Sequence, residues 1–433
     1  MTAPAWAEVS LEQPAVRELA MLSGRGPGLL RRWVAEHPTH GVARALLMLA
    51  TGDGLSDTTL RDELVVAHRD ARAAGERSMS LVYGVFLHTH RQYRLTADHL
   101  VTHFARWPGD EVAGLLVDAF HACGDAGYRT HGDTLVERQY AAAGADSWLW
   151  TSRMAWVRAE QGRPVEAYEL AGTALAHCPR SGLAAHARAH AEQELGAGPV
   201  STAFLDRWLA ADPHALQFRH LNWHAALQSL ACGDFADARG RADAVLDRTD
   251  VGMRAATNWR LLLAGQRPAH RSEPDHVREL LAAPGGMAEV FHTFNLALAL
   301  AVEAATDDLY ALARRAAADA RPDYHEVLAP VVEALADITA GRPHAAVDRL
   351  TGPAEWTDRL GGVRVEREIV QDTLARALVD TGAHTRAAGL LHHRTTTRRH
   401  HVYEDLLLTP RTVPAPAPPT APGSPAPRAT PVR

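Results

Sequence analysis

The chain of 433 residues contains no lysine, so all 45 of its basic residues are arginine. This absence excludes sites that depend on an amine, including Walker-type phosphate loops, protein kinases, Schiff-base enzymes and pyridoxal-phosphate enzymes. Isoleucine occurs only twice, against an excess of alanine, arginine and glycine. Such a composition is typical of proteins from high-GC bacteria.

Cysteine is also scarce. Cys123, Cys178 and Cys232 are odd in number, far apart and without CxxC spacing, which excludes a disulfide framework and favours a reducing compartment. The first residues lack the basic start and apolar run of a signal peptide. The most apolar stretch, FNLALALAVEAA from Phe294, reaches Glu303 after about nine residues and is too short to span a bilayer. We therefore expect a soluble, cytoplasmic protein with no membrane partner.

The charge balance gives no sign of a polyanionic partner. The net charge is −6 and the isoelectric point is near 6.5, so the sequence predicts no binding to nucleic acid. At 46% hydrophobic residues the chain can bury a large core. A chain of this length usually forms two or three domains, unless it is one repetitive array.

Strand signals are nearly absent, and helix-forming residues alternate with Gly-Asp, Gly-Arg and Pro from about Gln13 to Leu408. The breaks recur at a nearly constant interval, with steps of 38, 34, 37 and 32 residues. They fall at Gly124, Gly162, Gly196, Gly233 and Gly265. These steps scatter about the 34-residue tetratricopeptide period.

The clearest repeat unit is AWVRAEQGRPVEAYELAGTALAHCP. Counted from Gly162, small residues follow at +5 (Ala167) and +12 (Ala174), and Pro179 follows at +17. These offsets suit a hairpin in which alanines allow two helices to approach and proline ends the second helix. Three other turn glycines keep the +5 alanine, as Ala238, Ala346 and Ala387.

The predicted fold is all-α, a superhelical solenoid of degenerate tetratricopeptide-like hairpins over residues 1–408. Stacked hairpins bury their apolar faces on one another and leave a concave groove lined by the first helix of each pair. A plain helical bundle is the alternative. Residues 409–433 are mostly Pro, Ala, Thr and Arg and predict a disordered, polyproline-like tail.

Two histidine pairs stand out near the middle of the chain, in LAAHARAHAEQEL and HLNWHAALQSL. His186 and His190 form one pair, and His220 and His224 form the other. A spacing of four residues places each pair on one helix face. With 25 histidines, chance gives about one or two such pairs, and three occur, the third being His99 with His103.

Three segments of the chain, taken in order, resemble the tetratricopeptide repeat protein 38 family. They are HARAH, HLNWHAALQSLACGDFADA and GGVRVEREIVQDTLARALVDTGAHTRAAGLL. That family shows a HAVAH-like helix, an NHxWWHxAL-like helix ending in Gly-Asp, and a GGSxAQRD-like segment. The similarity extends from about Leu29 to Leu408 and implies a repeat fold without an established reaction. Departures from the family pattern are Gln193 for glutamate, Val363 for serine, Glu366 for glutamine and Glu368 for aspartate.

Three interpretations of His186, His190, His220 and His224 stay open. Imidazoles one turn apart on two helices can chelate one divalent ion such as zinc, nickel or ferrous iron. Buried histidines can equally serve interhelical packing. They can also act as acid or base without a metal. Packing or groove lining is the favoured interpretation, so the sequence predicts no obligatory cofactor.

Two further residues are candidates for a pocket or groove. Trp223 lies between His220 and His224 and could line a pocket with them, although large aromatics at helical spacing are more often core. Gly361 and Gly362 precede a helix predicted to begin near Val363. That helix start could receive an anion, with Arg367 as its partner, and salt bridges along the helix explain the same residues.

The function favoured by these patterns is a cytoplasmic scaffold that binds a protein or peptide in its concave groove. The alternative is an enzyme with a histidine-lined, metal-binding pocket closed by the GGVRVERE segment. A regulatory module of a lost effector domain is a third possibility. Scaffold and enzyme differ in whether the histidine rings converge on a shared point or disperse into packed contacts. The sequence does not determine the oligomeric state.

Overall fold

The computed structural model describes residues 9–246, 251–269, 274–283, 285–352 and 356–410, and within these ranges every regular element is helical. The first half comprises α1 (Pro14–Ala20), α2 (Gly26–Glu36), α3 (Gly41–Thr51), α4 (Asp57–Ala71), α5 (Glu76–Thr89), α6 (Tyr93–Arg106), α7 (Ala119–Ala122), α8 (Ala126–Ala143), α9 (Trp148–Glu160), α10 (Pro164–His177), α11 (Gly182–Leu195) and α12 (Pro199–Ala211). The second half comprises α13 (Phe218–Cys232), α14 (Phe235–Ala244), α15 (Val251–Leu263), α16 (Pro274–Ala282), α17 (Val290–Val302), α18 (Thr306–Ala317), α19 (Ala329–Thr339), α20 (Pro343–Leu350), α21 (Arg364–Asp380), α22 (His384–Thr397) and α23 (Val402–Leu408). Short 3-10 turns are η2 (Gly52–Gly54), η3 (Arg72–Ala74), η4 (Ala113–Leu116) and η7 (Thr357–Leu360), and η5 (Asp323–Leu328) is a π-helical turn.

The predicted helical region and its turn glycines are confirmed. Helices extend from Pro14 to Leu408, and each of the five predicted turn glycines has a positive φ just beyond a helix end. At Gly196, which ends α11 with φ +61°, a Cβ would meet the Arg399 backbone nitrogen at 2.7 Å. Glycine is required there both by the left-handed backbone and by the neighbouring chain.

The small residues predicted to lie between paired helices are buried completely. Ala167 and Ala174 of α10, and Ala238, Ala346 and Ala387 of later second helices, have no exposed surface. Helix α10 contacts both α9 and α11, and α9 also contacts α11. Neighbouring hairpins therefore share one apolar layer, as in helical repeat proteins.

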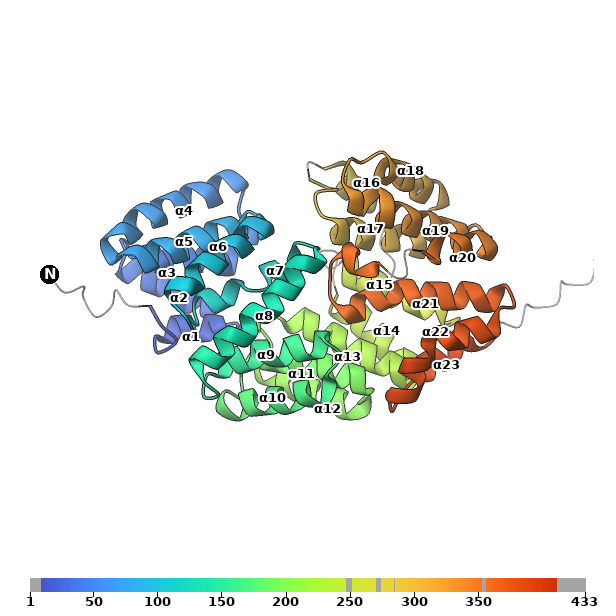
Figure 1. Ribbon diagram of the computed structural model, residues 1–433, viewed down its shortest axis with the longest axis horizontal. Coiled ribbons are helices and arrows are strands. Elements are labelled where there is room, and N and C mark those ends of the chain that lie inside the picture. The colour runs from blue at the N-terminus through green and yellow to red at the C-terminus, as the bar shows by residue number, and fades with distance from the viewer. Residues whose placement is uncertain (1–8, 247–250, 270–273, 284, 353–355, 411–433) are drawn as a thin grey trace, which may run out of the picture.

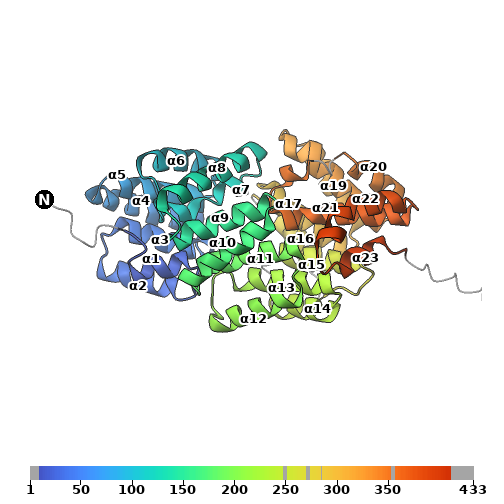
Figure 2. The same ribbon diagram turned by 60° about the horizontal axis from the view of Figure 1, so that its bottom comes forward.

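The hairpins follow a superhelical arc (Figure 1). In this view α1–α8 lie on the left, α9–α14 run along the bottom, and α15–α20 rise again on the right. Figure 2 shows α9, α11 and α13 as successive layers in the middle of the molecule. The chain is thus an all-α helical repeat fold, and its central layers carry both histidine pairs.

A buried ionic network attaches the C-terminal helices to these central layers. Arg398 pairs with Glu368 of α21 at 2.6 Å and with Glu404 of α23 at 2.9 Å, and it lies 3.7 Å from Glu194 of α11. Arg394 of α22 also pairs with Glu368, at 3.0 Å. Because removing one member would leave a buried charge unpaired, the network holds α21–α23 against α11.

None of the helices in the described ranges combines the length and apolar character that crossing a membrane requires. Most of the predicted Pro- and Ala-rich tail, residues 411–433, lies outside the described residues.

Candidate metal centre

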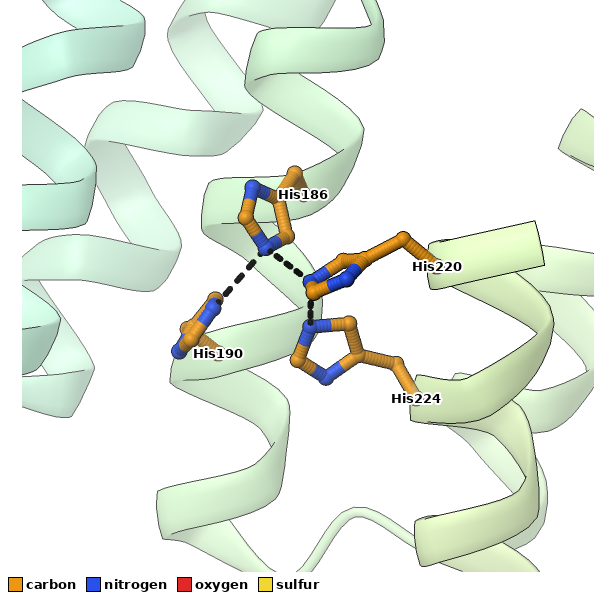
Figure 3. A group of neighbouring side chains, drawn as sticks. All are labelled: His186, His190, His220 and His224. Carbon is orange, nitrogen blue, oxygen red and sulfur yellow. Dashed lines mark hydrogen bonds between the residues drawn. The ribbon is translucent and has the colours of Figure 1, made fainter. Parts of the chain in front are cut away.

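The four central histidines converge. His186 and His190 project from α11 and His220 and His224 from α13, so that the four rings point toward one another (Figure 3). His186 Nε2 lies 2.9 Å from His190 Nε2 and 3.0 Å from His220 Nε2, and His220 Nε2 lies 3.2 Å from His224 Nε2. The four ligand nitrogens lie within 4.8 Å of one another. The sequence left this convergence open.

The repeat period explains why the two pairs meet. His220 follows His186 by 34 residues, and His224 follows His190 by the same interval. Equivalent positions on consecutive first helices face each other in a tetratricopeptide-like stack. The two pairs therefore form two levels. His186 and His220 are partly exposed, whereas His190 and His224 are buried.

Hydrogen bonding within the cluster is incomplete. A neutral imidazole nitrogen either donates one hydrogen or accepts one, yet the Nε2 atoms of His186 and His220 each approach two other ring nitrogens. At most two of the three N···N contacts can therefore be good hydrogen bonds. His224 Nδ1 is also buried without a hydrogen-bond partner. One cation at the centre would engage all four Nε2 lone pairs at once.

Burial keeps these imidazoles neutral. Desolvation lowers the pKa of His190 to about 3 and of His220 to about 4, and mutual repulsion adds to the effect for His190. The pKa values of His186 and His224 are lowered well below their ordinary value, chiefly by burial and then by the neighbouring imidazoles. The neutral ring is the form that binds a metal ion.

The spacing suits a first-row transition metal. Tetrahedral zinc with Zn–N bonds of about 2.0–2.1 Å holds its ligand nitrogens about 3.3–3.4 Å apart. Three of the nitrogen–nitrogen separations here are 2.9, 3.0 and 3.2 Å, and all lie within 4.8 Å. Ring rotations that open the close contacts and shorten the longest separation would bring the four nitrogens to that geometry. Four imidazole ligands favour zinc, copper, nickel or iron over magnesium and calcium.

A carboxylate of α9 lies beside the cluster. Glu160 Oε1 lies 3.7 Å from His190 Nδ1, the ring nitrogen that points away from the other imidazoles. The backbone N–H of Arg364, at the start of α21, donates to Glu160 Oε2 at 3.0 Å. Burial raises the pKa of Glu160 to about 7. Histidine ligands of metal sites are commonly oriented by such a partner on their second nitrogen.

At the Gly-Gly helix start, the backbone N–H of Arg364 already binds Glu160 of the same chain. Arg367 is held by the same segment, since its Nη1 donates to Gly362 O at 2.5 Å and its Nη2 lies 3.8 Å from Glu160. Arg367 and Glu160 both line a polar cleft of about 520 Å³ between α7–α8 and α21–α22. Arg367 thus belongs to this cleft, where it pairs with Asp358 at 3.2 Å and approaches Glu160.

Trp223 belongs to the core. It is 1% exposed, and its ring centroid lies 5.5 Å from that of His220 and 5.1 Å from that of His224. It packs among apolar residues of α13 and α14 behind the two imidazoles. Trp156 and Glu160 of α9 do face the cluster, beside His190. The sequence did not identify them as part of the site, although the repeat period places α9 one layer before α11.

No protein-family model and no curated protein matches this chain significantly. The resemblance to the tetratricopeptide repeat protein 38 family accordingly stays a prediction. Among solved structures, yeast Tom70 aligns with a TM-score of 0.35 and 12% identity over 91% of this chain and 85% of its own. The TPR domain of P58(IPK) gives 0.20 and 14% over 89% and 98%, and Naa15/Naa10 bound to HypK-THB gives 0.21 and 11% over 90% and 69%. Because these scores are low, the fold assignment rests on the helices of this chain.

Proposed function

We propose that this protein is a metal-binding helical repeat protein in which His186, His190, His220 and His224 hold one divalent transition-metal ion. The observation that carries the proposal is the approach of four Nε2 atoms to one another at the junction of two consecutive repeats. Zinc is the simplest occupant, because it accepts four neutral nitrogen ligands in a tetrahedral site.

The elements around the site agree with this role. The cluster lies between rigid helices, and Glu160 approaches the outer nitrogen of His190. No carboxylate belongs to the four-residue ligand set, which disfavours magnesium and calcium. His186 and His220 remain partly exposed, so an ion could exchange with solvent or accept a further ligand on that side.

The test is elemental analysis of tag-free protein together with three single variants. We expect about one zinc, nickel or iron per parent chain, and less than a tenth of that in His190→Ala and in His224→Ala. The matched control is His99→Ala, which removes a partly exposed histidine from a pair of the same spacing and should keep the metal. Folding of each variant is checked by far-ultraviolet circular dichroism. A parent that neither carries nor takes up metal would refute the proposal.

A protein or peptide partner in the concave groove of a cytoplasmic scaffold remains a separate prediction, supported by the helical repeat architecture. The two roles are compatible, because the histidines occupy only one junction of the array. Metal analysis tests the first role, and capture of a partner that survives His224→Ala would support the second one independently.

A further inference from the structure

Beside the four histidines, one face of α9 carries an arginine, a tryptophan and a glutamate. Arg153, Trp156 and Glu160 are spaced at i, i+3 and i+7, so they share that face. Trp156 and Glu160 flank His190, with a ring-centroid separation of 6.4 Å and an O···N distance of 3.7 Å. Arg153 lies two helical turns before Glu160 on the same face of α9, and α9 packs against α11. Its positive charge adds to the lowering of the His186 pKa, after burial and the neighbouring imidazoles.

Arg153 has few partners for a guanidinium. Its Nη2 donates to Leu115 O at 3.3 Å, and its Nε is buried without a hydrogen-bond partner. Within the part of the chain that the structure describes, no carboxylate forms an ion pair with it. Burial lowers its pKa, and Asp118 opposes this shift only through longer-range attraction. A positive charge in such surroundings is costly unless it has a counter-ion.

A bound metal ion would increase this excess of positive charge. Four neutral imidazoles leave the full charge of a divalent cation uncompensated, and Arg153 adds one more positive charge nearby. The nearest carboxylate on the α9 face, Glu160, approaches the buried level of the cluster at His190. The partly exposed level, formed by His186 and His220, has no anionic group of the four-residue cluster or of the α9 face next to it.

We infer that the exposed side of this centre takes an oxyanion, a carboxylate or phosphate group, which bridges the bound metal ion and the Arg153 guanidinium. The inference rests on the proposed metal site and specifies its ligand. One oxygen would coordinate the ion as a fifth ligand, on the side where His186 and His220 are partly exposed. A second oxygen would accept from Arg153, whose planar donors match both kinds of group. The protein would thus recognise small molecules or chain ends that carry such a group.

Cobalt(II) provides the test, because its visible absorption reports on its coordination. The parent protein is loaded with cobalt and titrated separately with sodium acetate and with inorganic phosphate. We expect at least one of the two to change the spectrum saturably while the bound cobalt stays constant. Comparison of the two titrations distinguishes a carboxylate site from a phosphate site.

Variants then locate the second contact. Arg153→Gln should weaken anion binding at least tenfold with unchanged cobalt content, and Arg153→Lys should recover part of it. Arg138→Gln, at an exposed position on α8, is the matched control and should bind as the parent does. If Arg153→Gln does not fold, the Arg153→Lys comparison and the parent titration still decide.

The outcomes separate the two proposals. Cobalt bound without any response to acetate or phosphate would overturn the anion inference and leave the metal site standing. Equal anion binding by the parent and by Arg153→Gln would also overturn it. A parent that binds no cobalt, zinc, nickel or iron would overturn both.

Discussion

Histidine pairs of identical spacing occur in two regions of this molecule, with different surroundings. On α6, His103 Nδ1 lies 2.8 Å from Ser80 Oγ and its Nε2 lies 3.0 Å from Asp110 Oδ2, while His99 Nε2 lies 2.8 Å from the Ser80 carbonyl oxygen. At the junction of α11 and α13, within the described part of the chain, the Nε2 atoms contact one another and have no other hydrogen-bond partner. Spacing along one helix therefore does not decide the role of a pair. The side chains that surround the pair decide it.

Added zinc should distinguish the two histidine regions most strongly. At a free concentration about a thousand times the dissociation constant, binding to the native state alone adds about 4 kcal/mol to the free energy of unfolding. We expect this gain in the parent and in His99→Ala, but not in His224→Ala. Urea unfolding with and without zinc measures it. Equal stabilisation of all three proteins would mean that the ion binds elsewhere.

At the α6 pair the decisive residue is Asp110, which accepts from Arg77 at 2.7 and 2.9 Å and approaches His103. These partners lower its pKa from 3.8 to about 2. A lowered pKa stabilises the folded state above about pH 4, and the contribution is lost as the pH falls toward 2. Asp110→Asn should therefore cost about 2 kcal/mol at pH 7, and the deficit should shrink between pH 4 and pH 2. Urea unfolding across this range provides the measurement, and zinc content should stay at the parental value.

Glu366 is a buried carboxylate whose pKa is shifted in the opposite direction to that of Asp110. Its Oε2 accepts from the Val363 N–H at 2.7 Å, but burial raises its pKa to about 7. A raised carboxyl pKa destabilises the folded state as the pH rises from about 4.5, and the loss is complete above about 7. Glu366→Gln keeps an acceptor for Val363 without the charge. We expect it to exceed the parent by about 3 kcal/mol at pH 8 and to match it near pH 4. Chemical denaturation at both pH values would reveal a constant difference if the charge is irrelevant.

The smallest effect concerns the carboxylate behind His190. Glu160→Gln keeps an oxygen for the Arg364 N–H and removes the charge, so zinc affinity should fall about tenfold, as for other outer partners of metal ligands. Competition with a chromogenic chelator measures the change. Glu169→Gln, at an exposed position on α10, serves as the control. A larger loss for the control would show that general surface charge governs the affinity.

Much of the fold could be predicted, because turn glycines and small residues mark helix ends and close helix contacts locally. Gly162 and Ala167 carry that signal within one repeat. The candidate site could be predicted only in part. The rings of His186 and His220 were identifiable as candidates, whereas Glu160 and Arg153 come from the preceding first helix. Their positions follow only after the repeats are stacked in register, and a degenerate repeat leaves that register uncertain by several residues.

The 34-residue interval between the histidine pairs has a mechanical consequence. An array of hairpins behaves like a spring whose turns touch only their neighbours, so bending is shared among many weak junctions. An ion held by both α11 and α13 would clamp one of these junctions. The two arms of the arc would then flex about a stiff centre, and the distance between them would depend on whether that clamp is closed.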